Sequence, residues 1–345
     1  MSTYELPPTD DRAVWDTWLS IHHLPSVTVA DDLGMLKSLH ESPAGAIELA
    51  DRLDCDRRTT VAIVRMLAAM GYLEQRLGVY QLTDPARLYL LRGSPYYWGH
   101  MLGHRTNVHD TLMERAMGRS PTGVPGHRDG DTKGDTSAVG WASGQIDLEH
   151  GRRIAAAMHS HSLPAATGLA RNGDFAGVTH LLDVGAGSGC YPIALVQANP
   201  RLRATIMELP AMCEAAQEYI LAAGVENRVD TVAVDMFREP WPRGYDGVFF
   251  ANVWHDWNFE TCAWLAKQTY DTLSPGGSIF LHEMLLDDDG DGPLTTVSFS
   301  MLMLGTEGQQ FTLPELKALL EGAGFTDVQA HHTYGYYSLV SARKQ

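Results

Sequence analysis

The stretch His180-Leu-Leu-Asp-Val-Gly-Ala-Gly-Ser-Gly-Cys190 joins an apolar run to a glycine-rich turn. Residues 178–184 are expected to form a buried parallel strand, and residues 191–198 the helix that follows it. Because glycine has no Cβ, a ligand can approach the backbone of such a turn closely. Three glycines at alternating positions form the turn: Gly185, Gly187 and Gly189.

The spacing of these glycines is G-x-G-x-G, and the acidic residue Asp183 lies at the end of the strand before them. Dinucleotide-binding folds have G-x-G-x-x-G instead. From Val178 onward, patterns typical of strands alternate with patterns typical of helices. This alternation predicts a Rossmann-like, doubly wound α/β domain, with helices on both faces of a mostly parallel sheet. The strands are expected at 179–184, 203–208, 229–234, 245–251, 278–284 and near 327–340.

The size and composition of the chain restrict its class. Its 345 residues exceed one typical hydrophobic core, so two domains are expected. With 42 acidic and 26 basic side chains, the formal net charge is −16, which disfavours binding to nucleic acid or anionic membranes. The four cysteines lack C-x-x-C spacing, which favours reduced thiols in a cytoplasmic protein. Neither a signal peptide nor a membrane span is expected.

The N-terminal part is expected to be mainly α-helical. Apolar residues recur at helical spacing over residues 12–40, and two short amphipathic helices are predicted at 46–53 and 59–70. Residues 71–75 and 78–83 are expected to form a two-stranded ribbon. Helices followed by a ribbon resemble a winged helix, for which the two interpretations are DNA binding and a dimerisation or docking module. The acidic balance and the apolar second helix, which belongs in a core, favour dimerisation.

The middle of the chain predicts a connection between two domains. Residues 119–145 are rich in Gly, Pro and Asp and are expected to form a long surface loop, followed by a helix from Asp147 to about Ala170. The expected organisation is a winged-helix-like dimerisation domain over 1–110, a loop and linking helices over 111–170, and a ligand-binding α/β domain over 171–345.

Polar residues follow the predicted strands at their carboxyl ends, where doubly wound sheets bind ligands. Glu208 ends the second strand and suits an acid that binds a ribose diol. Asp235 and Met236 follow the third strand. A carboxylate there can accept a hydrogen bond from the exocyclic amine of adenine, and a thioether can pack on the ring. Val253-Trp-His-Asp-Trp257 follows the fourth strand, and Glu283 ends the fifth.

Several motifs occur in order along the chain: Gly-x-Gly-x-Gly, Glu208-Leu-Pro, Asp235-Met-Phe, His255-Asp-Trp, Leu273-Ser-Pro-Gly-Gly and Leu319-Leu-Glu-Gly-Ala-Gly-Phe325. Others precede them: Leu33-Gly-Met-Leu36, Glu48-Leu-Ala-Asp-Arg-Leu53 and Leu82-Thr83. Together they resemble the S-adenosyl-L-methionine (SAM)-dependent O-methyltransferases, which include plant phenolic, acetylserotonin and bacterial natural-product enzymes. The resemblance covers nearly the whole chain. It implies SAM as cofactor, a small aromatic substrate of secondary metabolism, and a homodimer formed through the N-terminal domain.

The resemblance also implies which residues bind the cofactor. Asp183 would lie beside the methionyl amine and Glu208 would hold the ribose. Asp235 with Met236 would hold the adenine, and Ser162 falls where the family has a hydroxyl near the cofactor carboxylate. The glycines of the turn would border the cofactor: Gly185, Gly187 and Gly189.

His255 matches the general base of the family, with Asp256 and Glu283 as the carboxylates around it and Glu283 orienting the ring. Methyl transfer from a sulfonium is an in-line displacement, which needs alignment and a deprotonated nucleophile. A phenol has a pKa of about 10 and needs a base at neutral pH, a role that imidazole suits. The structural alternative is that His255 begins a helix capped by Asp256.

Four further positions are candidates for contact with the acceptor substrate. Ile154 and Met158 fall at substrate-lining positions of the family. Trp254 and Met301 could line an aromatic pocket, although such side chains are as often core residues.

Two positions depart from the family pattern. Gln310 stands where phenolic members often carry a second carboxylate near the base, and Ala251 replaces a frequent basic residue near the cofactor. A neutral Gln310 could bond a carbonyl or ring nitrogen of the substrate instead. The acceptor atom therefore stays open, with methylation of an indole, enol or quinol carbon as the alternative. A non-catalytic SAM-binding regulatory protein is a second alternative.

The 15 histidines include two close pairs that invite a metal-binding interpretation. His159 and His161 would diverge around a helix, and His331 and His332 would point to opposite faces of a strand. We therefore expect no metal site.

Overall fold

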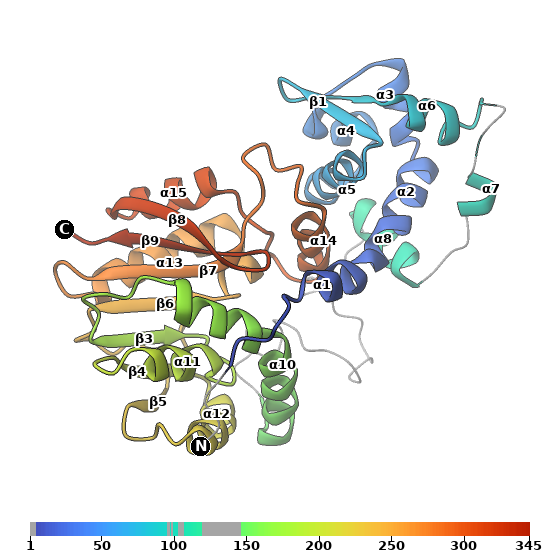
Figure 1. Cartoon of the computed structure of the whole chain (residues 1–345). Coiled ribbons are helices and arrows are strands. Elements are labelled where there is room, and N and C mark those ends of the chain that lie inside the picture. The colour runs from blue at the N-terminus through green and yellow to red at the C-terminus, as the bar shows by residue number, and fades with distance from the viewer. Residues whose placement is uncertain (1–4, 95–96, 98, 103–106, 119–145) are drawn as a thin grey trace. The chain divides into compact units, whose positions relative to one another are not determined.

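The computed structural model describes residues 5–94, 97, 99–102, 107–118 and 146–345. The loop predicted over 119–145 lies outside these residues. The chain divides into two compact units (Figure 1). We call them the sheet unit, which contains Met1–Arg12, Thr132–Leu285 and Leu313–Gln345, and the helical unit, which contains Ala13–Asp131 and Leu286–Thr312.

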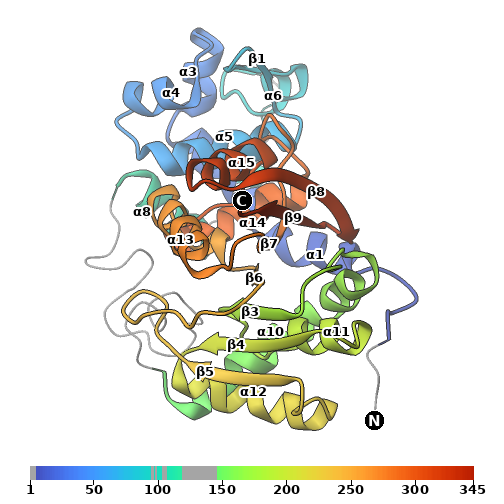
Figure 2. The same cartoon turned by 90° about the vertical axis from the view of Figure 1, so that its left-hand side faces the viewer.

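The sheet unit is built on a seven-stranded sheet in the order β5-β4-β3-β6-β7-β9-β8 (Figure 2). Neighbouring strands from β5 to β7 pair in parallel, and β9 pairs antiparallel with both β7 and β8. The strand predicted near 327–340 is instead a hairpin, because the chain reverses at Gly335, whose φ is 58°. The strands are β3 (His180–Val184), β4 (Arg203–Glu208), β5 (Val229–Ala233), β6 (Gly247–Ala251), β7 (Ser278–Met284), β8 (Thr326–Tyr334) and β9 (Tyr337–Arg343).

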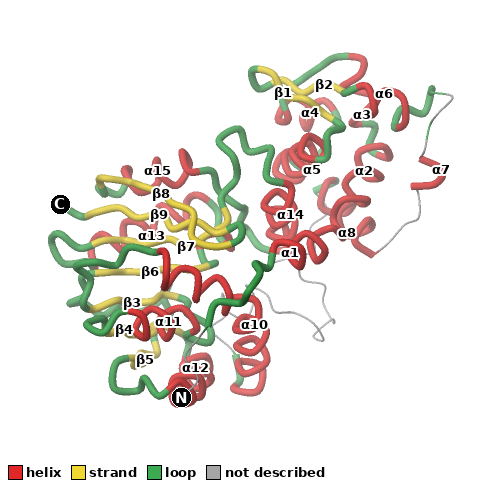
Figure 3. The backbone as a smooth tube through the Cα atoms, in the orientation of Figure 1, coloured by secondary structure: helices red, strands yellow, loops and turns green. Residues whose placement is uncertain are grey.

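Helices cover both faces of this sheet (Figure 3). α11 (Cys190–Ala198) and α12 (Pro210–Ala223) connect β3 to β4 and β4 to β5, and α10 (Leu148–Asn172) packs against both. α13 (Phe259–Thr272) connects β6 to β7 and packs against α15 (Leu313–Gly322). The strand order runs in opposite directions on the two sides of β3, so right-handed crossovers place these two helix groups on opposite faces. The predicted doubly wound α/β domain is confirmed.

The carboxyl ends of the central strands meet at one edge of the sheet. β3 and β4 end side by side at Val184 and Glu208, and β6 and β7 end at Ala251 and at Met284, the residue after Glu283. The apolar run of β6 is buried, as expected for a parallel strand that helices cover on both faces. The residues that follow these strands therefore share one edge, where the chemistry of the sheet unit is expected.

The helical unit contains a group of short helices and an antiparallel ribbon. The ribbon, β1 (Leu73–Arg76) and β2 (Val79–Leu82), confirms the strands predicted there. The turn η1 (Ser20–His22) lies between the first two helices. The helices are α1 (Arg12–Leu19), α2 (His23–Asp32), α3 (Met35–Glu41), α4 (Ala46–Arg52), α5 (Arg57–Ala69), α6 (Asp84–Tyr89), α7 (Gly99–Leu102) and α8 (Asn107–Ala116).

The helix α5 is a core element of this unit. It begins after Asp56, whose side chain accepts a hydrogen bond from the Thr59 N–H at 2.7 Å, an N-cap. Ile63, Val64 and Leu67 on α5 are fully buried in the core of the helical unit. The prediction that this apolar helix belongs in a core is confirmed.

One segment of the C-terminal half belongs to the helical unit. α14 (Leu294–Leu302) and the turn η3 (Met303–Gly305) add Val297, Met301 and Leu304 to the same core as α5. Conversely, the N-terminal residues join the sheet unit, where the Tyr334 hydroxyl donates to the Thr9 carbonyl at 3.2 Å. The sequence predicted domains over 1–110, 111–170 and 171–345. These ranges assign residues 286–312 and residues 1–12 to the other unit, because the order of elements does not reveal which distant segments pack together.

None of the described helices combines the length and the apolar character that crossing a membrane requires.

Candidate active site

A cavity of about 110 Å³ lies at the carboxyl ends of the central strands, within the sheet unit. The glycine turn after β3, the residues after β6 and part of α10 form its walls. Predicted site residues on these walls are Met158, Ser162, Asp183, Gly185, Gly187, Glu208, Met236 and Asp256.

The glycine turn has a left-handed backbone conformation that residues other than glycine rarely adopt. Gly185, Gly187 and Gly189 have φ angles of 72°, 58° and 74°. A Cβ on Gly185 would lie 2.9 Å from a methyl of Val253, and one on Gly189 would lie 2.5 Å from Ile206. A Cβ on Gly187 would meet nothing closer than the Met158 Cβ, at 3.9 Å. The space beside Gly187 is therefore cavity space that a side chain would enter.

Asp183 is a buried acid on the cavity wall, with 1% of its surface exposed. Within the described part of the chain, neither carboxylate oxygen has a hydrogen-bond partner. Burial, and next the charge of Glu208, raise the pKa of Asp183 well above its ordinary value. A buried carboxylate of this kind is suited to a cationic group of a ligand, because such a group would supply the missing partner.

Glu208 faces the same cavity and is held by the backbone. Its Oε1 accepts a hydrogen bond from the Gly187 N–H at 3.1 Å, and its Oε2 accepts one from the Leu209 N–H at 2.9 Å. Burial raises the pKa of Glu208 to about 7, although both N–H groups favour the ionised form. The carboxylate thus joins the glycine turn to the end of β4.

The remaining cofactor candidates occupy different positions. Ser162 on α10 and Met236 after β5 line the cavity. Asp235 is not on its wall: its Oδ1 accepts from the Phe237 N–H at 3.0 Å, and its Oδ2 pairs with Arg238 at 2.9 Å. Asp235 is therefore engaged locally, next to the methionine that reaches the cavity.

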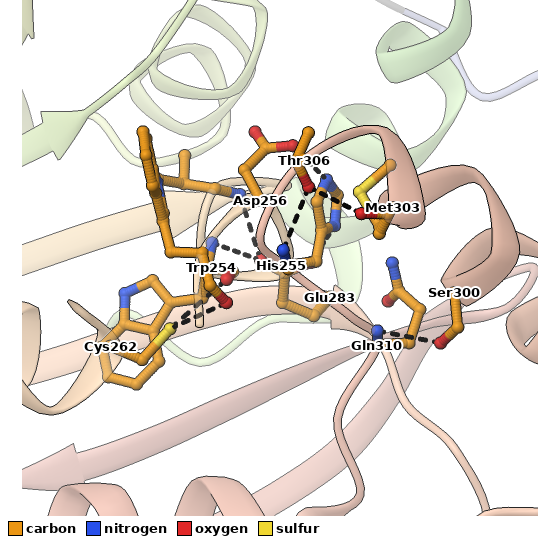
Figure 4. A network of polar contacts seen from close by, with 12 residues as sticks. Trp254, His255, Asp256, Cys262, Glu283, Ser300, Met303, Thr306 and Gln310 are labelled. Atoms are coloured by element: carbon orange, nitrogen blue, oxygen red, sulfur yellow. Dashed lines mark hydrogen bonds and ion pairs between the residues drawn. The ribbon is translucent and has the colours of Figure 1, made fainter. Parts of the chain in front are cut away.

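His255 and Glu283 form a buried pair (Figure 4). His255 lies in the turn η2 (Trp254–Asp256) after β6, and its Nδ1 is 2.9 Å from Oε2 of Glu283 on β7. Oε1 of Glu283 accepts hydrogen bonds from the N–H groups of Val253 at 3.1 Å and Trp254 at 3.2 Å. These bonds fix the carboxylate, which fixes the ring. With Nδ1–H donating to Glu283, the lone pair of the neutral imidazole is on Nε2.

Opposing effects set the basicity of this histidine. Burial lowers the pKa of His255, but the charge and hydrogen bond of Glu283, with a smaller contribution from Asp256, raise it above its ordinary value. Asp256, whose Oδ1 is 4.0 Å from Nε2 of His255, lines the cavity. Burial raises the pKa of Asp256 to about 6, against the attraction of His255.

The structural alternative for His255 and Asp256 is wrong. Asp256 does not cap the following helix. Asn258 caps α13 instead, because its side chain accepts a hydrogen bond from the Thr261 N–H at 2.9 Å.

Two of the predicted substrate positions in the sheet unit are core residues. Trp254 is fully buried, and its ring packs edge-on against Phe250, with the ring centroids 5.9 Å apart. Ile154 is buried with Met212 of α12, one helical turn before Met158. Of the three predicted substrate positions in the sheet unit, only Met158 lies on the cavity wall.

Two predicted substrate positions belong to the helical unit. Met301 is buried in its core. Gln310 is fully buried, and its backbone N–H donates to the Ser300 Oγ at 2.9 Å (Figure 4). Among the described residues, no partner bonds the side-chain amide of Gln310. That amide keeps the capacity to bond a polar group of a ligand.

Sequence reasoning missed other polar residues on the cavity wall, notably Asn252 and Ser188. Asn252 directly follows β6 and has a φ of 54°, so its place at a strand end could have identified it. Ser188, whose Oγ is 3.1 Å from Nδ1 of His159 on α10, lies between Gly187 and Gly189, so its place in the glycine turn could have identified it. In the described residues, no group of three or more His, Cys, Asp or Glu side chains could hold a metal ion.

A doubly wound sheet with a glycine turn and carboxylates at its strand ends defines the class of α/β enzymes that bind a nucleoside-containing cofactor. Within this class the chain belongs to the SAM-dependent O-methyltransferase family: the O-methyltransferase domain matches residues 133–326. It is therefore a methyltransferase, and its cofactor is SAM. Asp183 is buried and has no hydrogen-bond partner among the described residues, and this acid and the open space at Gly187 fit an amine-bearing cofactor.

Individual relatives agree with this assignment. The chain is 32% identical to 3-hydroxy-5-methyl-1-naphthoate 3-O-methyltransferase of Streptomyces sahachiroi, covering 88% of this chain and 86% of the relative. It is 30% identical to the acetylserotonin O-methyltransferase of Bos taurus, over 91% and 92% of the two chains. An O-methyltransferase family 2 protein of Planctomyces limnophilus, solved with apigenin, matches with a TM-score of 0.84, 27% identity and 100% coverage of both chains.

Proposed function

We propose that this protein methylates a hydroxyl group of a small, flat aromatic metabolite of secondary metabolism, with His255 as the general base. The observation that carries this proposal is the buried His255–Glu283 pair, next to Asp256 on the wall of the cavity. The relatives support the substrate class, since a hydroxynaphthoate, acetylserotonin and apigenin are all flat aromatic compounds.

For the cofactor, we propose that Asp183 binds the methionyl amine, Glu208 the ribose and Met236 the adenine, with Asp235 beside it. Ser162 would bind the carboxylate, and the three glycines would border the cofactor. The support is that nearly all of these groups line one cavity, with Gly189 and Asp235 directly beside it. Bound there, SAM supplies a methyl group on a positively charged sulfur.

The chain's own residues would prepare the acceptor. Nε2 of neutral His255 would remove the hydroxyl proton, and Glu283 would stabilise the resulting imidazolium through Nδ1–H. Asp256 would add a second negative charge at 4.0 Å from Nε2. The base is active only when neutral. Because the pKa of His255 is raised, the rate should increase with pH through a value above that of an ordinary histidine.

Replacing Glu283 with glutamine is expected to lower kcat roughly 100-fold or more, because the ring loses the acceptor that selects its tautomer. It should also move the rising limb of the pH profile to lower pH, since removing the negative charge lowers the pKa of His255. A pH series of kcat/KM measures both effects.

The matched control is Glu260→Gln, an exposed carboxylate in the first turn of α13. Glu260→Gln should not change the pH profile of kcat/KM. If the Glu283→Gln enzyme kept the wild-type pH profile, Glu283 would not be the residue that orients His255.

The substrate class is tested by incubating the protein with SAM and a panel of naphthols, flavones, hydroxyindoles and quinols. The proposal expects products heavier by one methyl, with an O–CH₃ signal by NMR. A C–CH₃ signal would establish the alternative of carbon methylation. Retained SAM binding with no product from any compound would favour the regulatory alternative.

We further propose that the protein forms a homodimer through the helical unit. Val14, Trp18 and Ile21 are 70%, 46% and 50% exposed, and they recur at helical spacing along α1 and η1. An exposed apolar stripe of this kind is typical of an interface. Ile21→Glu should convert a dimer to a monomer in size-exclusion chromatography with light scattering.

Leu221→Glu is the control, because Leu221 is 58% exposed on α12 of the sheet unit. It should leave the dimer intact. A wild-type monomer, or a dimer that survives Ile21→Glu, would contradict this interface.

For location, we propose the cytoplasm. All four cysteines are free thiols: Cys55, Cys190, Cys213 and Cys262. This state fits a reducing compartment. Thiol titration of protein isolated under alkylating conditions should find every cysteine reduced, and a disulfide would argue against this location.

A further inference from the structure

A histidine of α10 contacts the glycine turn beside the cofactor cavity. Met158 and Ser162 on α10 line this cavity, and so does Ser188 of the turn. Nδ1 of His159, the residue after Met158, is 3.1 Å from the Ser188 Oγ, which is hydrogen-bond distance. A Cβ on Gly187 would lie 3.9 Å from the Met158 Cβ, so the helix and the turn are neighbours here. His159 therefore joins two parts of the cavity wall.

The ring of His159 is held in turn by α12. It stacks on the ring of Tyr219, with the ring centroids 4.4 Å apart and the planes at 24°. α10 and α12 pack against each other along this contact (Figure 1). A Cβ on Gly151 of α10 would lie only 3.2 Å from the carbonyl oxygen of Ala211 on α12. The imidazole thus lies between an aromatic ring of a packed helix and a hydroxyl of the glycine turn.

The glycine turn is a segment that benefits from such an anchor. Three of its five residues, 185–189, are glycines, and glycine loses more conformational freedom on ordering than any other residue. The N–H groups of Gly185 and Gly189 donate to backbone carbonyls at 3.0 and 2.9 Å. Ser188 is the only polar side chain in this stretch of sequence. Its bond to His159 therefore ties the turn to α10 through side chains.

We propose that His159 is a positioning residue for the cofactor: it holds Ser188, and so keeps the glycine turn in the shape that binds SAM. A site that is ordered before the ligand arrives binds more tightly, because the ligand does not bear the cost of ordering it. The same turn meets SAM and its product S-adenosylhomocysteine (SAH), so both affinities depend on the anchor. The proposal rests on SAM binding in this cavity but not on His255 as base or on the acceptor.

Two substitutions separate the hydrogen bond of His159 from its ring contact. Burial lowers the pKa of His159, so the ring is neutral at neutral pH, and its Nδ1 either donates to the hydroxyl or accepts from it. Asparagine carries a donor and an acceptor on Cγ, where histidine carries Nδ1, so it can make either bond without the ring. Phenylalanine keeps a flat ring for Tyr219 and makes neither bond.

The test is isothermal titration of the full chain and of each variant with SAM and with SAH. His159→Phe is expected to raise both dissociation constants by about tenfold, which corresponds to about 1.4 kcal/mol and is near the upper end for one neutral hydrogen bond. With an acceptor from the panel above, KM for SAM should rise by a similar factor. At saturating SAM, kcat should stay within about twofold of wild type, because the lost interaction is made equally before and during methyl transfer.

Further variants assign the effect to the bond itself. His159→Asn should recover most of the affinity that His159→Phe loses. Ser188→Ala should also weaken SAM binding, and adding His159→Phe to it should weaken binding no further, since one bond cannot be lost twice. His180→Phe is the matched control, the same substitution at an exposed histidine at the start of β3, and should bind SAM as the wild type does.

The outcomes distinguish this proposal from the cofactor site on which it rests. Wild-type affinity in His159→Phe or in Ser188→Ala would overturn the proposal alone. An asparagine variant as weak as the phenylalanine variant would assign the effect to packing of the ring, and additive losses in the double variant would show that the two side chains act separately. Either result would also overturn it. A wild-type protein that does not bind SAM would reject the cofactor site and this inference together.

Discussion

Replacing His255 with alanine is expected to reduce kcat by about 10²–10⁴-fold, the usual contribution of a general base. The variant keeps every residue that lines the cavity, because His255 is not among them. Its affinity for SAM should therefore equal that of the wild type. Turnover is followed by mass spectrometry of the methylated product, and affinity by isothermal titration.

His180→Ala is the control, since His180 is an exposed histidine at the start of β3. It should retain full turnover. Because the alanine variant leaves Glu283 buried without its ring partner, its melting temperature should be checked, with His255→Asn as a polar substitute of smaller size. Parallel losses of SAM affinity and turnover in a folded His255 variant would assign His255 a structural role instead.

Replacing Gly187 with arginine is expected to weaken SAM binding at least about 100-fold, which corresponds to about 2.7 kcal/mol. A side chain at Gly187 would extend into the cavity, where the Glu208 carboxylate already bonds its N–H. The added guanidinium would reach acids that the cofactor needs, so the variant would occupy the site with its own cation. Titration with SAM measures the loss.

The control for backbone strain is Gly276→Arg. Gly276 has a φ of 77°, close to the 58° of Gly187, and nothing lies within 4 Å of a Cβ there. Both variants therefore place an arginine in the left-handed region at a similar cost, but only Gly187→Arg blocks the cavity. Tight SAM binding by Gly187→Arg would place the cofactor elsewhere.

Local patterns predicted most of the sheet unit. The apolar runs before Asp183 and Glu208 end where β3 and β4 end, because a parallel strand covered on both faces must be continuously apolar. The hairpin of β8 and β9 was not resolved into two strands. Its turn at Gly335 separates two stretches of similar composition, so only their antiparallel pairing distinguishes them.

The site was partly predictable because local patterns locate the ends of the strands. Strand ends identified Asp183, Glu208, His255 and Glu283 as a set, because parallel strands end at a common edge. The pairing of Nδ1 with Oε2 and the two backbone bonds that hold Glu283 depend on distances that no local pattern contains. Trp254, an equally plausible ligand contact by composition, is core because its ring faces Phe250.

The amino-acid sequence by itself determined the elements, their order and the chemical groups at the strand ends, since these depend on periodicity and on residue type. Tertiary structure alone decided that α14 completes the core of the helical unit. It also decided that Asp183 is buried near the charge of Glu208, with no hydrogen-bond partner in the part of the chain that the structure describes. Long-range packing sets burial, and burial sets the pKa of each acid and base. The same carboxyl group can therefore be a solvated surface charge or a buried acid with a raised pKa, depending on what the fold places around it.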